Sequence, residues 1–547
     1  MARGAPRHGQ AGAHRRRRRR PRTHLGRRRD LARAGSRRVS VGRTRAVSLL
    51  GLEGALVEVE ADIGPGLPAF VIIGLPDASL GEARDRVRAA ATNAGCALPA
   101  RKLTVNLSPA SLPKHGSSFD LAIAMAALAA SGLVSAQSVE EAVHLGELGL
   151  DGRVRPVDGV LPAVLAARRA GVRTVVVPAD AVDEASLVPG ISVVGVASLR
   201  EAAIRHGADL VPEPVDAIRR PRVDDPRRQD TDLGDVIGNS DAVEALVVAA
   251  AGGHHLLMVG PPGAGKSMLA ARLPGLLPDL DVDEALEVSS VRSLSGRPID
   301  GELERRPPFE DPHHTSSAAA MVGGGSSVIR PGAVTRASRG VLFLDEAPEF
   351  SQSVLDCLRQ PLESGQVVIH RARAVARFPA RFQLVAAANP CPCGQHGTRD
   401  GDCVCTPIQR RRYHAKLSGP LVDRIDIQLQ VARISSAQFR LAETAEVVTT
   451  AAARARVEEA RRRSAARLAD TPWRLTAEVS GTWLRSPGRR LPLSATRPID
   501  RALESGALTM RGYDRVLKVA WTLADLDAAD VPGHGHVARA LGLRRSL

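Results

Sequence analysis

The sequence predicts an α/β fold organised around a nucleotide-binding parallel sheet, and two segments carry this prediction. In the first, the apolar run Leu256–Val259 leads into the glycine-rich string GPPGAGKS, which a helical pattern follows at once. In the second, the apolar run Val341–Leu344 ends in the adjacent acids Asp345 and Glu346. Short apolar runs that alternate with longer helical patterns are typical of mixed α/β domains.

The glycine-rich string matches the phosphate-loop pattern, which ends in Lys and Ser. Glycine lets the backbone turn sharply and approach a phosphate closely. The amides of the loop and of the next helix then point at phosphate oxygens. Lys266 is expected to reach the β and γ phosphates, and the Ser267 hydroxyl to hold Mg²⁺, so ATP and Mg²⁺ are the predicted cofactors. The predicted nucleotide-binding residues are Gly260, Pro261, Pro262, Gly263, Ala264, Gly265, Lys266, Ser267 and Asp345.

Polar residues after two later apolar runs complete the predicted hydrolytic site. In such a sheet Asp345 holds Mg²⁺, directly or through water, and Glu346 polarises the attacking water. A further run, Phe382–Pro390, places Asn389 at its end, where ligands bind at the carboxyl edge of parallel strands. There Asn389 can position the lytic water. The alternative is that Asn389 only forms an Asn-Pro turn.

Four of the six cysteines are clustered, as Cys391, Cys393, Cys403 and Cys405. Four thiols in one small loop (391–405) could close a tetrahedral Zn²⁺ site, with His396 as a possible substitute ligand. The C-x-C spacing differs from the usual C-x₂-C knuckle, and reduced cysteines in a plain loop are the alternative. So few cysteines in 547 residues do not form a disulfide scaffold, which favours a reducing, cytoplasmic location.

The net charge of +16 comes from one end of the chain. Residues 1–45 hold 17 of the 75 basic residues and one of the 59 acidic residues, so the remainder carries 58 of each sign. We expect this arginine-rich extension to be disordered, either as a nucleic-acid-binding arm or as an addition from an upstream start codon. No apolar run reaches membrane-spanning length and no secretory signal is evident, so no membrane partner is expected.

Composition and periodicity divide the rest of the chain. Residues 46–212 read as a mixed α/β domain, and residues 213–231, rich in Pro, Arg and Asp, read as a linker. Residues 232–433 form the domain around the phosphate loop, and residues 434–547 are mainly helical. Strands are expected at 56–63, 70–76, 102–109 and 174–178, and helices at 82–94, 120–131, 451–468 and 512–525.

Three arginines, one near the end of the phosphate-loop domain and two in the helical C-terminal section, are candidates for stabilising the charge of the transferred phosphoryl group. Arg424 lies between acids on a strand-like segment and could reach the nucleotide of an adjacent subunit, or form a surface salt bridge. Arg511 and Arg515, at the start of a late amphipathic helix, are candidates for a sensing arginine from a lid. The segment Asp311–Ser327 reads as a flexible Gly/Ser loop, either a mobile pore loop or a plain surface loop. Its adjacent His313 and His314 should diverge on any regular element.

At this point several longer motifs identify a family resemblance. They are GLP and GLPD within Gly66–Asp77, NLSPASLPKHGSSFDL at Asn106–Leu121, HLGELGLDGRVRPVDGVLP at His144–Pro162, GPPGAGKS, DPHHTSSAAAMVGGG, GVLFLDEAPEF, ANPCPCG and LSGPLVDRIDIQL. From about Val47 to Leu526 the chain resembles the magnesium-chelatase-like AAA+ ATPases of the YifB/ComM family, bacterial proteins associated with DNA branch migration during natural transformation.

The resemblance implies an AAA+ phosphate-loop core with a helical C-terminal lid. It further implies a homo-hexameric ring that binds ATP at subunit boundaries and single-stranded or branched DNA in a central pore. In that family's scheme Asn389 is sensor 1, Arg424 the trans-acting finger and Arg511 sensor 2. The string PGAVTRASRG at Pro331–Gly340 and the late segment LTMRGYDR at Leu508–Arg515 depart from the family's usual pattern.

The first domain resembles the protease domain of Lon. The string PKHGSS places Ser118 on the serine position, whereas Val164 stands where the activating lysine should be. A serine without its base is a weak nucleophile, so we expect a structural or docking role rather than peptidase activity.

Three functions therefore compete at the level of sequence. The first is an ATP-driven motor on DNA, acting by branch migration or helicase-type remodelling. The second is a magnesium-chelatase-type motor subunit that drives metal insertion by a partner enzyme. The third, an ATP-dependent protease, is disfavoured by Val164. Few aromatic residues are present to stack on bases, so a DNA motor of this composition would track the phosphate backbone.

Overall fold

The computed structural model describes residues 41–544, apart from 75–77, 115, 222–230, 326–328, 372–373, 398–402 and 443–446. Most of the predicted extension over residues 1–45 lies outside the described residues. Its last residues are an exception, because strand β1 already begins at Gly42. Thr44 and Arg45 pair there with Val59 and Glu58 of strand β2, so ordered structure starts earlier than the charge pattern predicts.

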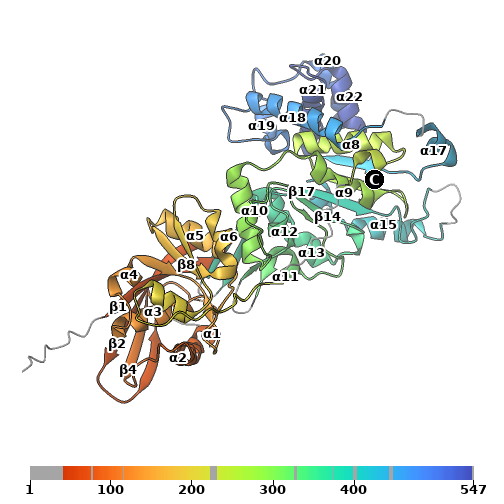
Figure 1. Ribbon diagram of the computed structural model, residues 1–547. Helices are drawn as coiled ribbons and strands as arrows, with labels where there is room; N and C mark the ends of the chain where they lie inside the picture. The colour runs from red at the N-terminus through yellow and green to blue at the C-terminus, as the bar shows by residue number, and fades with distance from the viewer. Residues whose placement is uncertain are drawn as a thin grey trace, which may run out of the picture. The chain divides into compact units, whose positions relative to one another are not determined.

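The N-terminal domain is built on a mixed seven-stranded sheet (Figure 1). Its order is β3-β4-β2-β1-β5-β8-β9. Strand β2 runs antiparallel to its neighbours β4 and β1, and every other adjacent pair in the sheet is parallel. The strands are β1 (Gly42–Leu50), β2 (Glu53–Gly64), β3 (Ala69–Ile73), β4 (Lys102–Ser108), β5 (Ala142–His144), β8 (Thr174–Pro178) and β9 (Ser192–Val196), with a separate pair β6 (Glu147–Leu148) and β7 (Val154–Arg155).

One helix of this domain, α3 (Asp120–Ser131), is almost wholly buried against β1 and β2. Its run of alanine and leucine suits a helix packed on several sides, and Gly132 ends it in the left-handed conformation (φ 75°). The other helices are α1 (Ala78–Gly81), α2 (Ala83–Asn93), α4 (Ala136–Glu140), α5 (Val160–Arg169), α6 (Val182–Ser186) and α7 (Leu199–Arg205), with a 3₁₀ turn at Ala179–Ala181.

The central domain holds a parallel five-stranded sheet in the order β11-β14-β17-β10-β18 (Figure 1). Its strands are β10 (Leu256–Val259), β11 (Phe309–Glu310), β14 (Val341–Leu344), β17 (Gln383–Ala388) and β18 (Ile427–Gln430). Numbered along the chain, the order is 5-1-4-3-2. Strands β10, β14 and β17 are fully buried, which explains why they read as continuous apolar runs.

This domain also contains helices and short hairpins. The helices are α8 (Ser240–Gly252), α9 (Lys266–Leu276), α10 (Val282–Leu294), α11 (Ala318–Val322), α12 (Ala333–Arg336), α13 (Gln352–Cys357), α14 (Arg359–Ser364), α15 (Pro407–Ala415), α16 (Gly419–Val422) and α17 (Ser436–Ala442). The hairpins are β12 (Gly323–Gly324) with β13 (Arg330–Pro331), and β15 (Gln366–Arg371) with β16 (Ala374–Pro379). Short 3₁₀ turns lie at Leu233–Asp235 and Ala347–Glu349.

Two expectations for this domain are corrected. The segment Asp311–Ser327 is not a continuous flexible loop, because α11 and β12 lie within it and the Ser317 side chain caps α11. Arg424 does not lie on a strand. The helix α16, with Pro420 in its first turn, ends at Val422, and Arg424 occupies the turn before β18.

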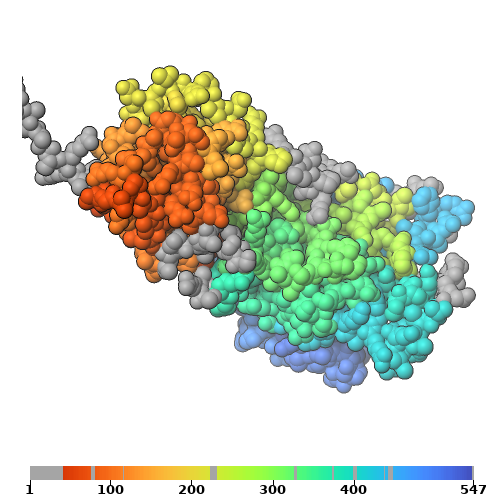
Figure 2. All heavy atoms as spheres, turned by 90° about the horizontal axis from the view of Figure 1, so that it is seen from below, coloured from red at the N-terminus to blue at the C-terminus, as the bar shows by residue number. Residues whose placement is uncertain are grey.

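The C-terminal section is helical, as predicted. It contains α18 (Thr450–Arg467), α19 (Gly481–Leu484), α20 (Leu493–Glu504), α21 (Met510–Leu526) and α22 (His534–Gly542), with a 3₁₀ turn at Thr476–Glu478. Helix α18 packs against α8 and α9, and Figures 1 and 2 show the blue C-terminal helices against the green central domain. Among the described residues, no helix combines the length and apolar composition needed to cross a bilayer.

Candidate nucleotide site and cysteine cluster

The phosphate loop occupies the carboxyl end of β10. Gly263 and Gly265 adopt positive φ angles of 76° and 87°, and α9 begins directly afterwards at Lys266. A Cβ atom at Gly260 would lie 2.2 Å from the carbonyl oxygen of Val431, so a larger residue does not fit there. The glycines thus occupy the positions where backbone shape demands them, and the loop is open for an anion at the start of α9.

Lys266 lies beneath this loop with little exposure to solvent. Its Nζ donates to the carbonyl oxygens of Gly260 (2.7 Å) and Pro261 (3.0 Å) and to Oδ1 of Asn389 (3.2 Å). Burial lowers the pKa of Lys266, while the nearby carboxylates of Asp345 and Glu346 oppose this effect. The structure therefore places the Asn389 side chain against Lys266.

Ser267 meets the acidic pair across the sheet edge. Its Oγ donates to Oδ2 of Asp345 over 2.8 Å, and Oδ1 of Asp345 accepts from the backbone N–H of Glu346 over 2.9 Å. A serine hydroxyl and a carboxylate are hard oxygen ligands of the kind that Mg²⁺ takes, together with waters and phosphate oxygens. The two residues thus fit the predicted ion.

Glu346 stands in the left-handed region, with φ 49° and about half of its side chain exposed (51%). Nδ1 of His314 lies 3.8 Å from Oε2 of Glu346, and the His313 and His314 rings lie 4.2 Å apart. The two rings do not diverge as predicted, because they lie in a turn rather than on a regular element. A hollow of about 350 Å³ is lined by Ser267, Ala271, Phe309, Asp311, Pro312, His313, His314, Phe343, Asp345 and Glu346.

A second cavity, of about 540 Å³, opens on the other side of the phosphate loop. Val236, Ile237, Met268, Ile434 and Phe439 give it apolar walls, and Gly263, Ala264 and Gly265 border it. A flat aromatic base suits such a wall beside a phosphate site. Sequence reasoning missed the apolar wall residues, because they come from three separate segments and only the fold brings them together.

The three candidate arginines, Arg424, Arg511 and Arg515, lie near one another. Burial and the nearby Arg511, Arg515 and Arg359 lower the pKa of Arg424. Arg424 contacts the Pro420 carbonyl oxygen and Glu363, and Nη1 of Arg511 lies 3.0 Å from Oδ2 of Asp423. In the described part of the chain, neither makes an ion pair or hydrogen bond to the phosphate loop of its own subunit.

The side chain of Arg515 is more buried than that of Arg511. It pairs with the buried Asp426, whose other carboxylate oxygen lies 3.2 Å from Nδ1 of His254. The partner atoms hold the pKa of Asp426 well below its usual range in spite of burial. This network joins α21 to the turn before β18, so Arg515 has a structural role.

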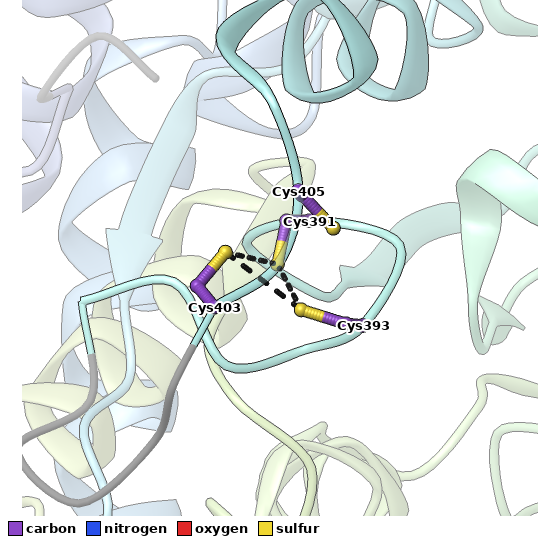
Figure 3. Close-up of side chains that lie close together, drawn as sticks. All are labelled: Cys391, Cys393, Cys403 and Cys405. Atoms are coloured by element: carbon purple, nitrogen blue, oxygen red, sulfur yellow. Dashed lines mark hydrogen bonds between the residues drawn. The ribbon is translucent and has the colours of Figure 1, made fainter.

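The four cysteines converge, as Figure 3 shows. The Sγ atom of Cys391 lies 3.3 Å from that of Cys393 and 3.7 Å from that of Cys403, and Cys393 and Cys403 are 3.7 Å apart. All four sulfur atoms, including that of Cys405, lie within 4.8 Å of one another. The ring of His396 accepts from Arg410 instead of joining this group, so the substitute-ligand prediction for His396 is wrong.

In the N-terminal domain, Ser118 borders a cavity shared with Gly159 and Val160. Val164 is fully buried in α5. Lys114 is also buried, but its Nζ donates to the carbonyl oxygens of Gly74 (3.0 Å) and Pro109. The amine of Lys114 is therefore occupied by backbone acceptors.

The sheet order 5-1-4-3-2, with a phosphate loop after the first strand and an acidic pair after the third, defines an AAA+ P-loop protein. Family models agree with this class. The model described as magnesium chelatase, subunit ChlI, matches residues 232–439. Models for subunit ChlI of Mg-chelatase and for the ChlI C-terminal region match residues 59–181 and 448–544.

Relatives match nearly the whole chain. An uncharacterized protein of Mycobacterium tuberculosis is 50% identical over 93% of this chain and 99% of its own length. The uncharacterized protein YifB of Escherichia coli is 40% identical over 92% and 97%, and the competence protein ComM of Haemophilus influenzae is 39% identical over 90% and 96%. The chain belongs to the YifB/ComM family of magnesium-chelatase-like AAA+ ATPases.

Proposed function

We propose that this chain is an ATP-hydrolysing ring motor that acts on DNA, by branch migration or helicase-type remodelling in recombination or natural transformation. The observation that carries the proposal is the contact between Ser267 and Asp345, with Glu346 adjacent and Asn389 beside Lys266. One site thereby combines an Mg²⁺ position, a candidate base for water and a polar sensor. A relative at 39% identity bears the name competence protein, which supports the choice of DNA.

In this scheme Lys266 and the loop amides hold the β and γ phosphates, and Ser267 and Asp345 hold Mg²⁺. The ion, when bound, neutralises charge that develops on the phosphates. Glu346 polarises the attacking water, and Asn389 orients that water from the end of β17. The proposal also includes cytoplasmic location and a Zn²⁺ ion at the four cysteines.

The arginine group supports a homo-hexamer. Among the residues that the structure describes, Arg424 and Arg511 make no ion pair or hydrogen bond with the phosphate loop of their own chain, and the Arg511 side chain is 76% exposed. An arginine finger acts by stabilising negative charge on the transferred phosphoryl group. A neighbouring subunit in a ring would present Arg424 and Arg511 to the nucleotide across the subunit boundary.

Basic residues on the hairpins are the proposed contact with DNA. Arg371, on β15, contacts the carbonyl oxygen of Gly325, next to strand β12. Arg330, on β13, is 68% exposed. Cations of this kind bind the phosphate backbone without reading its sequence. Hydrolysis would move these hairpins, and with them the glycine segment Gly323–Gly325, against the DNA strand.

The test is the ATPase rate of the full chain with and without a four-way DNA junction, alongside single-stranded and duplex DNA. We expect the junction or the single strand to stimulate hydrolysis, and the Lys266→Ala variant to show no activity under any condition. If none of the three DNAs changes the ATPase rate of the wild type, the DNA assignment is contradicted. The ATPase assignment is unaffected by that result.

A second candidate is a magnesium-chelatase-type motor subunit that drives metal insertion by a partner enzyme. The descriptions of the three family models favour it. It predicts co-purification with a chelatase catalytic subunit and ATPase stimulation by that subunit rather than by DNA.

A further inference from the structure

The four cysteines have the spacing of ligands around one tetrahedral ion. Zn²⁺ with Zn–S bonds of about 2.3 Å sets its sulfur atoms about 3.8 Å apart. The Sγ–Sγ distances of 3.3, 3.7 and 3.7 Å among Cys391, Cys393 and Cys403 are close to this value. A disulfide would need about 2.05 Å. All six cysteines of the chain are free thiols, so no disulfide competes for these four.

The surroundings of the thiols also suit a bound cation. The backbone N–H of His396 donates to Sγ of Cys391 over 3.4 Å, and Cys391 is fully buried. Outer-shell donors of this kind orient and stabilise metal-bound ligands. Tetrahedral sites with four sulfur ligands select zinc or iron, and four thiolates on one ion leave no open position for substrate. The donor set therefore indicates a closed, structural site.

The position of the cluster connects it to the nucleotide site. Cys391 lies two residues after Asn389, whose side chain accepts from Lys266. Cys405 lies two residues before α15. An ion shared by Cys391 and Cys405 would fasten the end of β17 to the start of α15.

Helix α15 in turn contacts the segment that carries Asn389. Nε2 of His414 donates to the Pro390 carbonyl oxygen over 2.9 Å. The residue Asn389 is thereby held between the cluster on one side and α15 on the other.

The cysteine loop also touches the phosphate loop directly. Gly394 has φ 74°, and a Cβ atom built on it would lie 2.6 Å from Cδ of Pro262. The turn from Cys391 to Gly394 therefore packs closely against Pro262, and only glycine fits at position 394. A shift of this turn would therefore displace Pro262, which belongs to the phosphate loop.

We propose that Cys391, Cys393, Cys403 and Cys405 bind one Zn²⁺ ion, and that this ion is a clasp which positions Asn389 and supports the phosphate loop. The clasp part of the proposal rests on the proposed ATPase function, whereas the metal part does not. His414 is a positioning residue, because it acts on Asn389 through the neighbouring Pro390. Loss of the ion would slow turnover more than it weakens nucleotide binding, because the water-orienting group would no longer be held, whereas Lys266 and the loop glycines would remain in place.

The metal part is tested by elemental analysis of the full chain purified without chelators. We expect one zinc per chain in the wild type and in the control variant Cys357→Ser, whose thiol lies outside the cluster. Cys403→Ser and Cys405→Ser should lose most of the zinc, and Cys403→His, which keeps a zinc-binding side chain, should retain it. Refolding with Co²⁺ should give the visible bands of tetrahedral cobalt–thiolate.

Two outcomes overturn the metal assignment. One is wild-type protein that holds no zinc and does not acquire the cobalt bands. The other is iron in place of zinc, recognised by its charge-transfer absorption. If the serine variants do not fold, release of zinc from folded wild type, measured with a thiol-modifying reagent and a zinc-sensitive dye, supplies the stoichiometry.

The clasp part is tested by kinetics. In zinc-depleted Cys403→Ser we expect kcat for ATP to fall by about tenfold or more, while the Kd of a fluorescent ATP analogue changes much less. Cys403→His should rescue kcat together with zinc. Zinc loss without a change in kcat overturns the clasp. If the wild type does not hydrolyse ATP at all, the proposed function fails, and the zinc stoichiometry still decides the metal assignment.

Discussion

The Ser267 hydroxyl donates to the Asp345 carboxylate over 2.8 Å, although 77 residues separate them in the chain. Strand β17 lies between the strands that carry them, so the contact forms only because all three strands run parallel and end at the same edge. This contact brings the phosphate loop and the acidic pair into one site. The candidate base, Glu346, stands next to it in a strained left-handed conformation.

Glu346→Gln should separate nucleotide binding from hydrolysis. The amide keeps the shape of the side chain but cannot polarise water as a carboxylate does, so we expect kcat to fall by about a hundredfold or more. Nucleotide affinity should stay within a few-fold of wild type. Single-turnover hydrolysis and binding of a fluorescent ATP analogue measure the two effects. The matched control is Glu349→Gln, whose carboxylate contacts Lys416 instead, and it should hydrolyse ATP normally.

Gly260→Ala should damage the phosphate loop. The new methyl group would meet the backbone carbonyl of Val431 at 2.2 Å, and a backbone atom cannot move aside as a flexible side chain can. We expect a loss of about 1–3 kcal/mol in the free energy of unfolding, together with weaker ATP binding. Gly535→Ala is the control, because open space surrounds that position. Equal stability of the two variants would argue against close packing of the loop on Val431, directly after β18.

Much of this site could be predicted from the sequence, because its parts are local. The phosphate loop, the acids after β14 and Asn389 after β17 each follow a buried apolar run, which is a strong short-range signal. Helix α3 and strand β8 were also predicted with the bounds that the structure has. Long apolar or strongly periodic segments determine their own structure.

Other features depend on contacts between distant segments. Strand β5 is only three residues long and pairs with its neighbours β1 and β8. A segment this short has no periodic pattern from which the strand could be predicted. His314 approaches Glu346 through a turn, and the apolar cavity combines residues near 237, 268 and 439. The convergence of the cysteines needed the fold as well, since their C-x-C spacing alone left a plain loop as an alternative.

Arg424 should act on the nucleotide of a neighbouring subunit. Arg424→Ala and Lys266→Ala should each abolish steady-state hydrolysis alone, because each removes one half of every shared site. Mixing the two variants should restore part of the activity, since some boundaries then pair an intact Lys266 with an intact Arg424. Arg462→Ala, an exposed arginine on α18 that pairs with Glu459, is the control for loss of charge. An absence of recovery on mixing, with rings formed, would count against action in trans.

Buried neutral histidines should make the protein less stable in mild acid. Burial lowers the pKa of His144 to about 3 and that of His255 to about 4, from an ordinary value of 6.5. Above pH 6.5 both residues are neutral in the folded and unfolded states. Between pH 6.5 and about 4, these histidines bind protons in the unfolded chain but stay neutral in the folded chain. Each histidine then removes up to about 1.4 kcal/mol from the free energy of unfolding per pH unit.

Urea unfolding at pH 7, 6 and 5 measures this slope. His144→Gln should flatten it, although the loss of hydrogen bonds to Thr44 and His206 lowers stability at every pH. The exposed His534 is the control position, and His534→Gln should leave the slope unchanged. A wild-type stability that is constant from pH 7 to pH 5 contradicts the assignment of neutral buried histidines.

Arg371→Ala should weaken DNA binding in a salt-dependent way. If Arg371 contacts a phosphate, its removal eliminates the release of about one counterion per contact, so the slope of log affinity against log salt should become less steep by about one per subunit engaged. The effect should be equal for different base sequences, since phosphate contacts carry no sequence information. Arg474→Ala, an exposed arginine that pairs with acids near α10, is the matched control and should bind DNA as the wild type does. Fluorescence anisotropy of a labelled junction across a salt series gives both slopes. An unchanged slope for Arg371→Ala would move the DNA contact away from the β15 hairpin and onto another surface of the ring.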